Sequence, residues 1–129
     1  MTTIMRLTFV SMLMIVAAPA YSATAVHIFD CTISGDASED QITVAATKWL
    51  AAARSMTGGE QFEAYILFPV AAQTNDIDVK FLIIAPSLKS LGAFWDGYSD
   101  DSPAARVDDE NPGFAECPDS ALWSGEKVE

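Results

Sequence analysis

The pair of cysteines, Cys31 and Cys117, constrains this chain most, because the sequence contains no others. They lie 86 residues apart, so a disulfide between them would close most of the chain into one loop. In the chain-entropy account, a crosslink over a loop of that length stabilises the folded state by about 4–5 kcal/mol. No Cys-x-x-Cys spacing is present to tune a thiolate, which disfavours redox chemistry. We therefore predict a structural disulfide, with two free or intermolecular thiols as the alternative.

Residues 1–22 have the order of a cleavable secretory signal peptide. One basic residue precedes an apolar run, 7–18, which is followed by small residues. A membrane span needs roughly 20 apolar residues, so this shorter run favours cleavage over a retained anchor. Cleavage between small residues is possible after Ala20, Ser22 or Ala25. We expect a periplasmic or secreted protein that has no membrane attachment after cleavage, in a compartment that oxidises cysteines.

The charge balance excludes whole classes of partner. Seven basic residues stand against 18 acidic ones, for a net charge of −11. Such a chain repels phosphate backbones and anionic lipid, so we expect no nucleic-acid binding and no adhesion through a basic patch. The hydrophobic content of 50% is too high for a disordered acidic chain. Residues 23–129 are therefore expected to form a single folded domain.

Alternation of apolar and polar residues, with β-branched and aromatic side chains, marks the expected strands. These strands are 26–31, 62–68, 77–85 and 120–124.

Two helices are expected between these strands. The first runs from Ser38 to about Met56, because Ser38 and Gln41 form a capping-box pattern and a Gly-Gly pair follows. The second begins after Ser87 and places Leu88, Leu91, Trp95 and Tyr98 on one face. Residues 100–117 are acidic and contain prolines, so we expect a solvated loop with at most one helical turn near 104–107.

The resulting order is β-α-β-β-α-β, which predicts an α+β, ferredoxin-like domain. Such a domain has a four-stranded antiparallel sheet with its helices on one face. Its last strand pairs antiparallel with its first, so Cys31 at the end of the first strand would lie close to Cys117 just before the last. The element order and the cysteine positions agree, although neither was used to derive the other.

The chain also resembles small exported bacterial proteins of the dimeric α+β barrel type. The resemblance rests on short fragments that together span most of the domain: 27–31, 46–54, 65–69, 81–86 and 117–123. It implies a homodimer in which two sheets face each other. Some wider relatives are cofactor-independent monooxygenases or haem-degrading enzymes, but no residue pattern here carries those activities over. We therefore assign no catalytic residue and expect no cofactor.

Few residues of the sequence are candidates for catalysis or for metal binding. His27 is the only histidine, and we interpret it as a packed strand residue rather than a catalytic group or a metal ligand. The acidic segments 96–101 and 108–113 lack the spacing of a calcium-binding loop, so we interpret them as solvated loops and expect no metal site.

The aromatic and aliphatic residues are more informative. A single sheet with helices on one side leaves its other face bare, and Tyr65, Leu67, Leu82 and Ile84 are expected there. Bare apolar faces mark interfaces, so a second copy could cover this one and leave a cavity for a small apolar ligand. The residues that we expect to line such a cavity are His27, Tyr65, Leu82, Ile84 and Trp95.

These observations favour an exported, non-catalytic domain that binds a small ligand or another protein. One alternative is a monooxygenase-like enzyme that uses a barrel cavity, with His27, Tyr65 and Trp95 in polar roles. The other is a structural accessory of an envelope complex that binds no small ligand.

Overall fold

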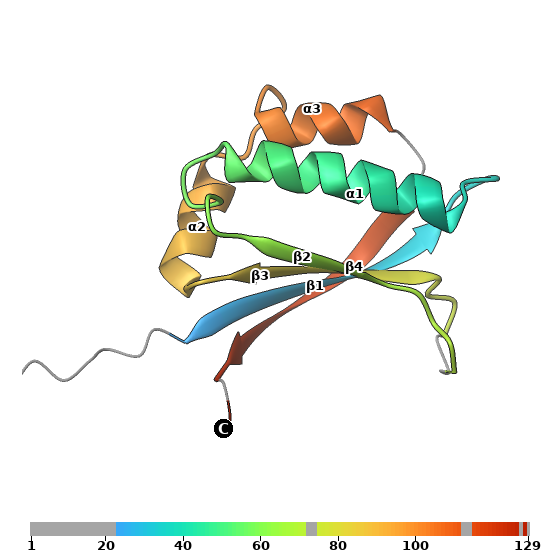
Figure 1. Cartoon of the computed structure of the whole chain (residues 1–129), viewed down its shortest axis with the longest axis horizontal. Coiled ribbons are helices and arrows are strands. Elements are labelled where there is room, and N and C mark those ends of the chain that lie inside the picture. The colour runs from blue at the N-terminus through green and yellow to red at the C-terminus, as the bar shows by residue number, and fades with distance from the viewer. Residues whose placement is uncertain (1–22, 72–74, 112–114, 127, 129) are drawn as a thin grey trace, which may run out of the picture.

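The computed structural model describes residues 23–71, 75–111, 115–126 and 128, and residues 1–22, the expected signal peptide, lie outside this description. Helices cover one face of a four-stranded sheet, with α1 and α3 side by side above it and α2 at one end (Figure 1). The order is β1 (Thr24–Ile33), α1 (Glu39–Arg54), β2 (Glu63–Leu67), β3 (Val79–Ala85), α2 (Leu88–Asp96), α3 (Pro103–Glu110) and β4 (Ala115–Gly125). The strands lie in the order β2-β3-β1-β4, and every neighbouring pair is antiparallel. The predicted ferredoxin-like α+β fold is confirmed.

The central strand, β1, sets which residues face the helices. His27 lies opposite Ile83 of β3 and Leu122 of β4, and the next residue along β1, Ile28, lies opposite Leu82. Because side chains alternate along a strand, these two sets of neighbours lie on opposite faces of the sheet. Ile83 is fully buried beneath the helices, so we call its side the closed face and the other side the open face.

Local sequence explains where α1 begins. The Ser38 hydroxyl accepts from the Gln41 backbone N–H at 3.3 Å, and the Gln41 side chain accepts from the Ser38 N–H at 2.9 Å. This reciprocal pair satisfies two of the free N–H groups that every helix start exposes. The predicted capping box is therefore present.

The turn after α1 depends on Gly58. Its φ is +89°, and a Cβ there would collide with the Ser90 carbonyl oxygen and the Phe94 nitrogen of α2. The Ser90 hydroxyl also donates to the Gly58 carbonyl oxygen. Glycine thus permits both the left-handed backbone and the close contact with α2.

β1 is longer at both ends than the predicted strand 26–31, and two other regions differ more from the prediction. The region expected to be a loop contains α3, which begins with Ser102 as its N-cap and Pro103 in its first turn. β4 starts at Ala115 rather than at 120 and includes Pro118. A proline is tolerated there because β4 is an edge strand, and its pairing with β1 shifts register between Asp30 and Thr32.

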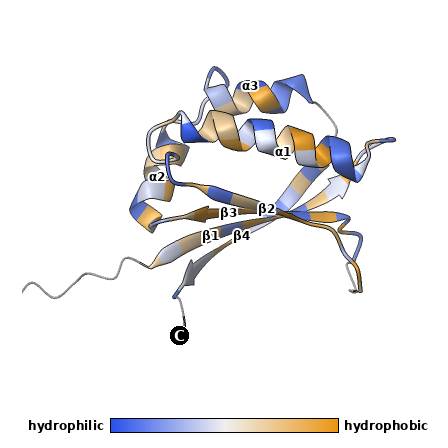
Figure 2. Ribbon diagram, in the orientation of Figure 1, coloured by the Kyte–Doolittle hydropathy of each residue, from blue (hydrophilic) through white to orange (hydrophobic). Residues whose placement is uncertain are grey.

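The core lies between the closed face and the helices, and Figure 2 shows apolar residues on α1 and α3 as well as on the strands beneath them. Phe62 and Phe94 are fully buried, with ring centroids 4.9 Å apart. Cys31 and Cys117 form the predicted disulfide, which ties β1 to β4. Within the described residues, none of the helices has the length and apolar character needed to cross a bilayer.

Candidate functional site

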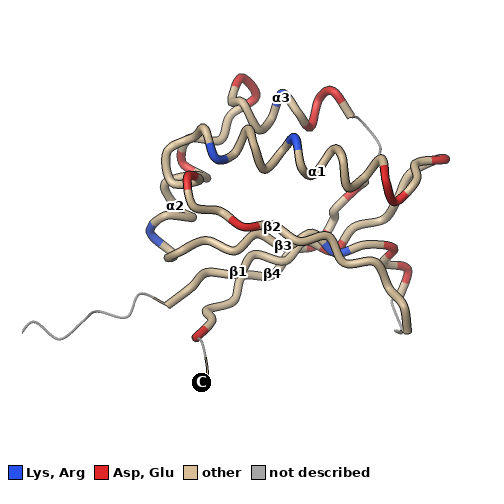
Figure 3. The backbone as a smooth tube through the Cα atoms, viewed as in Figure 1, with Lys and Arg blue, Asp and Glu red and all other residues tan. Residues whose placement is uncertain are grey.

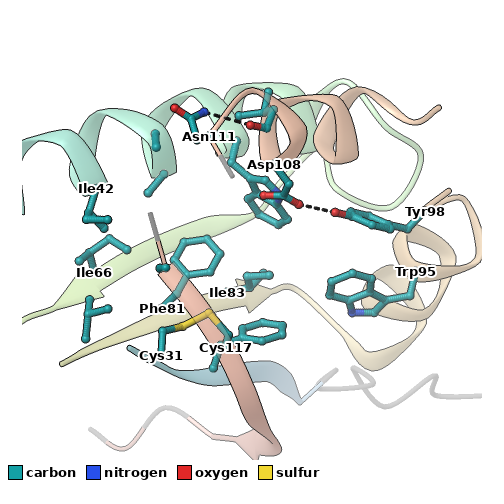
Figure 4. A pocket seen from close by; sticks show the side chains of 17 residues that line it. Cys31, Ile42, Ile66, Phe81, Ile83, Trp95, Tyr98, Asp108, Asn111 and Cys117 are labelled. Atoms are coloured by element: carbon teal, nitrogen blue, oxygen red, sulfur yellow. Dashed lines mark hydrogen bonds between the residues drawn. A yellow bond between two sulfur atoms is a disulfide. The ribbon is translucent and has the colours of Figure 1, made fainter. Parts of the chain in front are cut away.

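A cavity of about 430 Å³ lies beside the core, between the closed face of the sheet and the helices (Figure 4). This volume is within the range of about 300–1,000 Å³ that is usual for small-molecule sites. The sheet contributes Ile66, Phe81 and Ile83, and the Cys31–Cys117 disulfide also lies in the wall. α1 contributes Trp49. The polar residues of the wall come from the segment that runs from the end of α2 to the end of α3.

The polar part of the wall is centred on Asp108. Tyr98 donates a hydrogen bond from its hydroxyl to the Asp108 carboxylate. The neighbouring Asn111 donates from Nδ2 to the Val107 carbonyl oxygen at 3.0 Å, which leaves its Oδ1 free of that bond. Among the described residues that line the cavity, Asp108 is the only charged one.

Burial alters the ionisation of this pair. Desolvation raises the pKa of Asp108 above its usual value, and the charge of Asp109 adds to the rise. Hydrogen bonds from Tyr98 and Trp49 act in the opposite direction. Burial, together with the bond and charge of Asp108, raises the pKa of Tyr98 well above its usual range. Tyr98 is therefore protonated at any physiological pH, and it is the donor of the pair.

His27 lies on the closed face, next to the cavity. Its ring centroid is 4.1 Å from that of Phe29 and 5.7 Å from that of Trp95. Its Nε2 lies 3.2 Å from the Ser120 hydroxyl, whereas its Nδ1 and the Trp95 Nε1 are buried without a hydrogen-bond partner. Burial lowers the pKa of His27, so its ring is neutral at pH 7.

The open face carries the other candidate residues. Tyr65 lies opposite Leu82 in the β2–β3 pairing, and Ile84 lies opposite Val26 in the β1–β3 pairing. Tyr65 is 50% exposed, whereas Leu82 and Ile84 are partly buried. Asp30 and Lys80 form an ion pair on this face, so the positive charge of Lys80 is neutralised.

The structure thus divides the residues predicted to line a cavity. Trp95 lines the cavity beneath the helices, and His27 packs against Trp95 without lining it. Tyr65, Leu82 and Ile84 lie on the open face, away from this cavity. The Asp108–Tyr98 pair was missed, because Asp108 falls in a segment that reads as a solvated acidic loop. The Ser102-Pro103 pair was the one available signal, since it is typical of a helix start.

Metal ligation finds no support in this geometry. Within the described residues, no group of three or more His, Cys, Asp or Glu side chains could hold a metal ion. Acidic residues lie near the two ends of α3 and at the start of α1, and others lie on the strands and in the connections between them, as Figure 3 shows.

The similarity of this chain to known proteins lies in its fold. No protein-family model matches the sequence, and no curated protein matches it. The structure is similar to hydroxynitrile lyase from Passiflora edulis, with a TM-score of 0.56 and 9% identity over 84% of this chain and 98% of that one. It is also similar to a dimeric ferredoxin-like protein of unknown function from Thermobifida fusca YX, with a TM-score of 0.49 and 10% identity over 81% of this chain and 91% of that one. At this identity, likeness to the lyase shows a shared fold and nothing about activity.

Proposed function

We propose that this protein is an exported, non-catalytic binding protein for a small and largely apolar organic ligand. The cavity between the sheet and the helices is the observation that carries the proposal, because it has the size and the mostly apolar lining of a ligand site. A purely structural accessory would need no such space. The signal-peptide pattern of residues 1–22 and the disulfide support a location outside the cytoplasm.

Filling the cavity from α1 tests this function. Ala46 lines the cavity, whereas Ala51 is exposed on the same helix, so Ala46→Phe and Ala51→Phe form a matched pair. The probe is N-phenyl-1-naphthylamine, an uncharged fluorophore that brightens in apolar surroundings. We expect saturable brightening with the native protein and with Ala51→Phe, and at least a tenfold weaker affinity with Ala46→Phe. Absence of saturable binding, or equal binding by both variants, would contradict the proposal.

A second copy of this chain is the proposed occupant of the open face. Val26, Ile28, Leu82 and Ile84 form a contiguous apolar patch across β1 and β3. The Lys80 charge is already neutralised by Asp30, so the centre of this face offers little to a charged partner. The acidic helix ends lie on the other side of the sheet (Figure 3), so the acidic groups that two copies would bring together are Glu63 and Asp119 on the outer strands of the open face.

A catalytic alternative rests on the Asp108–Tyr98 pair. A carboxylate whose pKa is raised is suited to accept a proton from a bound substrate. The similarly folded hydroxynitrile lyase suggests one substrate to try, because its name denotes cleavage of hydroxynitriles. In that reaction a base removes the hydroxyl proton, the carbon–carbon bond to the nitrile breaks, and cyanide leaves an aldehyde behind.

Release of aldehyde from racemic mandelonitrile separates the two candidates. A binding protein gives no release above the uncatalysed rate. Release that Asp108→Asn abolishes and Asp109→Asn preserves would replace the binding function with the catalytic one.

A further inference from the structure

The aromatic side chains in the cavity wall form a continuous arc. Trp49 contacts Phe81 with ring centroids 5.2 Å apart, and Phe81 lies 6.2 Å from Phe29. Phe29 lies 6.3 Å from Trp95, which in turn lies 5.2 Å from Tyr98. All five line the cavity, so a ligand there is in contact with aromatic rings contributed by the sheet, by α1 and by the α2 end.

Asp108 closes this arc into a ring. Its carboxylate accepts from the Tyr98 hydroxyl at one end of the arc, and it interacts with the Trp49 side chain at the other. The carboxyl group of Asp108 and the Tyr98 hydroxyl face each other at the upper side of the cavity (Figure 4). The cavity therefore combines five aromatic rings with one acidic group.

Within the part of the chain that the structure describes, no cation lies in the cavity to balance this acidic group. Among the described lining residues none is lysine, arginine or histidine. On α3, the charge that acts on Asp108 is Asp109, which has the same sign, and Arg106 of the same helix does not line the cavity. A partly desolvated carboxylate is costly unless a positive charge or hydrogen bonds compensate for it, and here the described lining residues supply hydrogen bonds only.

We propose that the ligand is an organic cation, a protonated or quaternary amine with an apolar body, whose charge lies between Asp108 and the aromatic rings. This inference rests on the proposed ligand-binding function and names the chemical class of the ligand. Aromatic faces attract cations through the quadrupole of the ring, and quaternary ammonium groups are recognised in this way. An anionic ligand is disfavoured by Asp108 and by the net charge of −11.

The size of the cavity limits the ligand further. A cavity of about 430 Å³ is much larger than a bare ammonium group. Apart from Asp108, Tyr98, Asn111 and the indole N–H groups of Trp49 and Trp95, the described lining residues are apolar or part of the disulfide, so most of a ligand's surface would contact apolar groups. The ligand class is therefore an amine that carries an aryl group or an alkyl chain.

A pair of isosteres tests the charge directly. Benzyltrimethylammonium and neopentylbenzene have the same shape, but only the first is charged. Displacement of N-phenyl-1-naphthylamine from the native protein gives both affinities. We expect the cation to bind at least about tenfold more tightly than its uncharged isostere.

Two neighbouring variants locate the effect. Asp108→Asn and Asp109→Asn change the net charge equally, but only Asp108 lines the cavity. We expect Asp108→Asn to remove the preference for the cation and Asp109→Asn to preserve it. Circular dichroism checks that both variants fold, and the comparison of isosteres on the native protein needs no variant.

The outcomes separate this inference from the function on which it rests. Equal or tighter binding of neopentylbenzene by the native protein would overturn the proposal that the ligand is a cation, and it would leave the proposed binding of an apolar ligand intact. Equal losses in the two variants would overturn the role of Asp108 and assign the preference to net charge. Binding of neither compound, together with no binding of the fluorophore, would overturn both.

Discussion

The two faces of the sheet are built from the same strands, yet they differ in how far their side chains are buried. On β3, Ile83 is fully buried beneath the helices, whereas its neighbour Ile84 is only partly covered. The closed face holds the core, the disulfide and the cavity. The open face carries exposed apolar side chains, such as Trp123 at 61%. The alternation of a strand thus lets one segment stabilise the fold on one side and remain available for association on the other.

The largest effect that can test this difference comes from the disulfide on the closed side. Replacing Cys31 with Ser should lower the free energy of unfolding by roughly 2–5 kcal/mol, because the unfolded chain loses a closed loop. Chemical denaturation of the native protein and of Cys31→Ser measures the loss, and the native protein under reducing conditions serves as the control. Unchanged melting between oxidising and reducing conditions would show that the disulfide contributes no stability.

A matched pair on β3 compares the two faces within one strand. Ile83→Ala should cost about 2–5 kcal/mol, because it opens a void in a packed core. Ile84→Ala should cost less than half as much at concentrations where the protein is monomeric, since its side chain already contacts solvent. Urea unfolding at low protein concentration measures both. Equal costs would mean that the two faces are buried alike within a single chain.

Association through the open face predicts a different response from Leu82. Leu82→Glu should weaken dimerisation by at least tenfold while the monomer remains folded, because a charge would be buried in the interface. Light scattering across a range of concentrations measures the oligomeric state. Leu88→Glu is the control, because Leu88 is an exposed leucine at the start of α2. A monomeric native protein at all concentrations would remove the proposed partner copy.

The smallest expected effect is the pH response of His27. Burial lowers its pKa below the ordinary histidine value of 6.5, so the folded state binds a proton less readily than the unfolded state. His27 therefore contributes stability that is present above pH 6.5 and is lost as the pH falls through its folded-state pKa. His27→Ala should retain the fold and the dimer, and it should lose less stability than the native protein between pH 7 and pH 5.5. Unfolding curves at the two pH values measure this difference, and equal losses would contradict it.

The sequence predicts the fold well where local signals and burial agree. Ser38 and Gln41 mark the start of α1, the apolar run of β3 marks a central strand, and the cysteines lie where the topology joins them. In these cases the local pattern is itself the cause of the structure.

The sequence predicts the site poorly, because the cavity is formed by long-range packing. α3 buries only the small side chains of Ala104 and Ala105 within a polar segment, so its apolar pattern is weak. Asp108 lies on that helix, and its position against Tyr98 follows from how α3 packs beside α1. Trp95 lines the cavity beneath the helices. Tyr65, Leu82 and Ile84 lie on the open face, as the alternation of the strands predicts, and so they are away from that cavity.

The position of the disulfide links the shape of the cavity to the oxidation of the two cysteines. Cys31 and Cys117 line the cavity, and their bond holds the first half of β4 against β1 beside the register shift. With both thiols reduced, only the strand pairing around that irregularity would keep this wall in place. We therefore expect the proposed ligand site to be complete only once the disulfide has formed, which in a cell would require a compartment that oxidises cysteines.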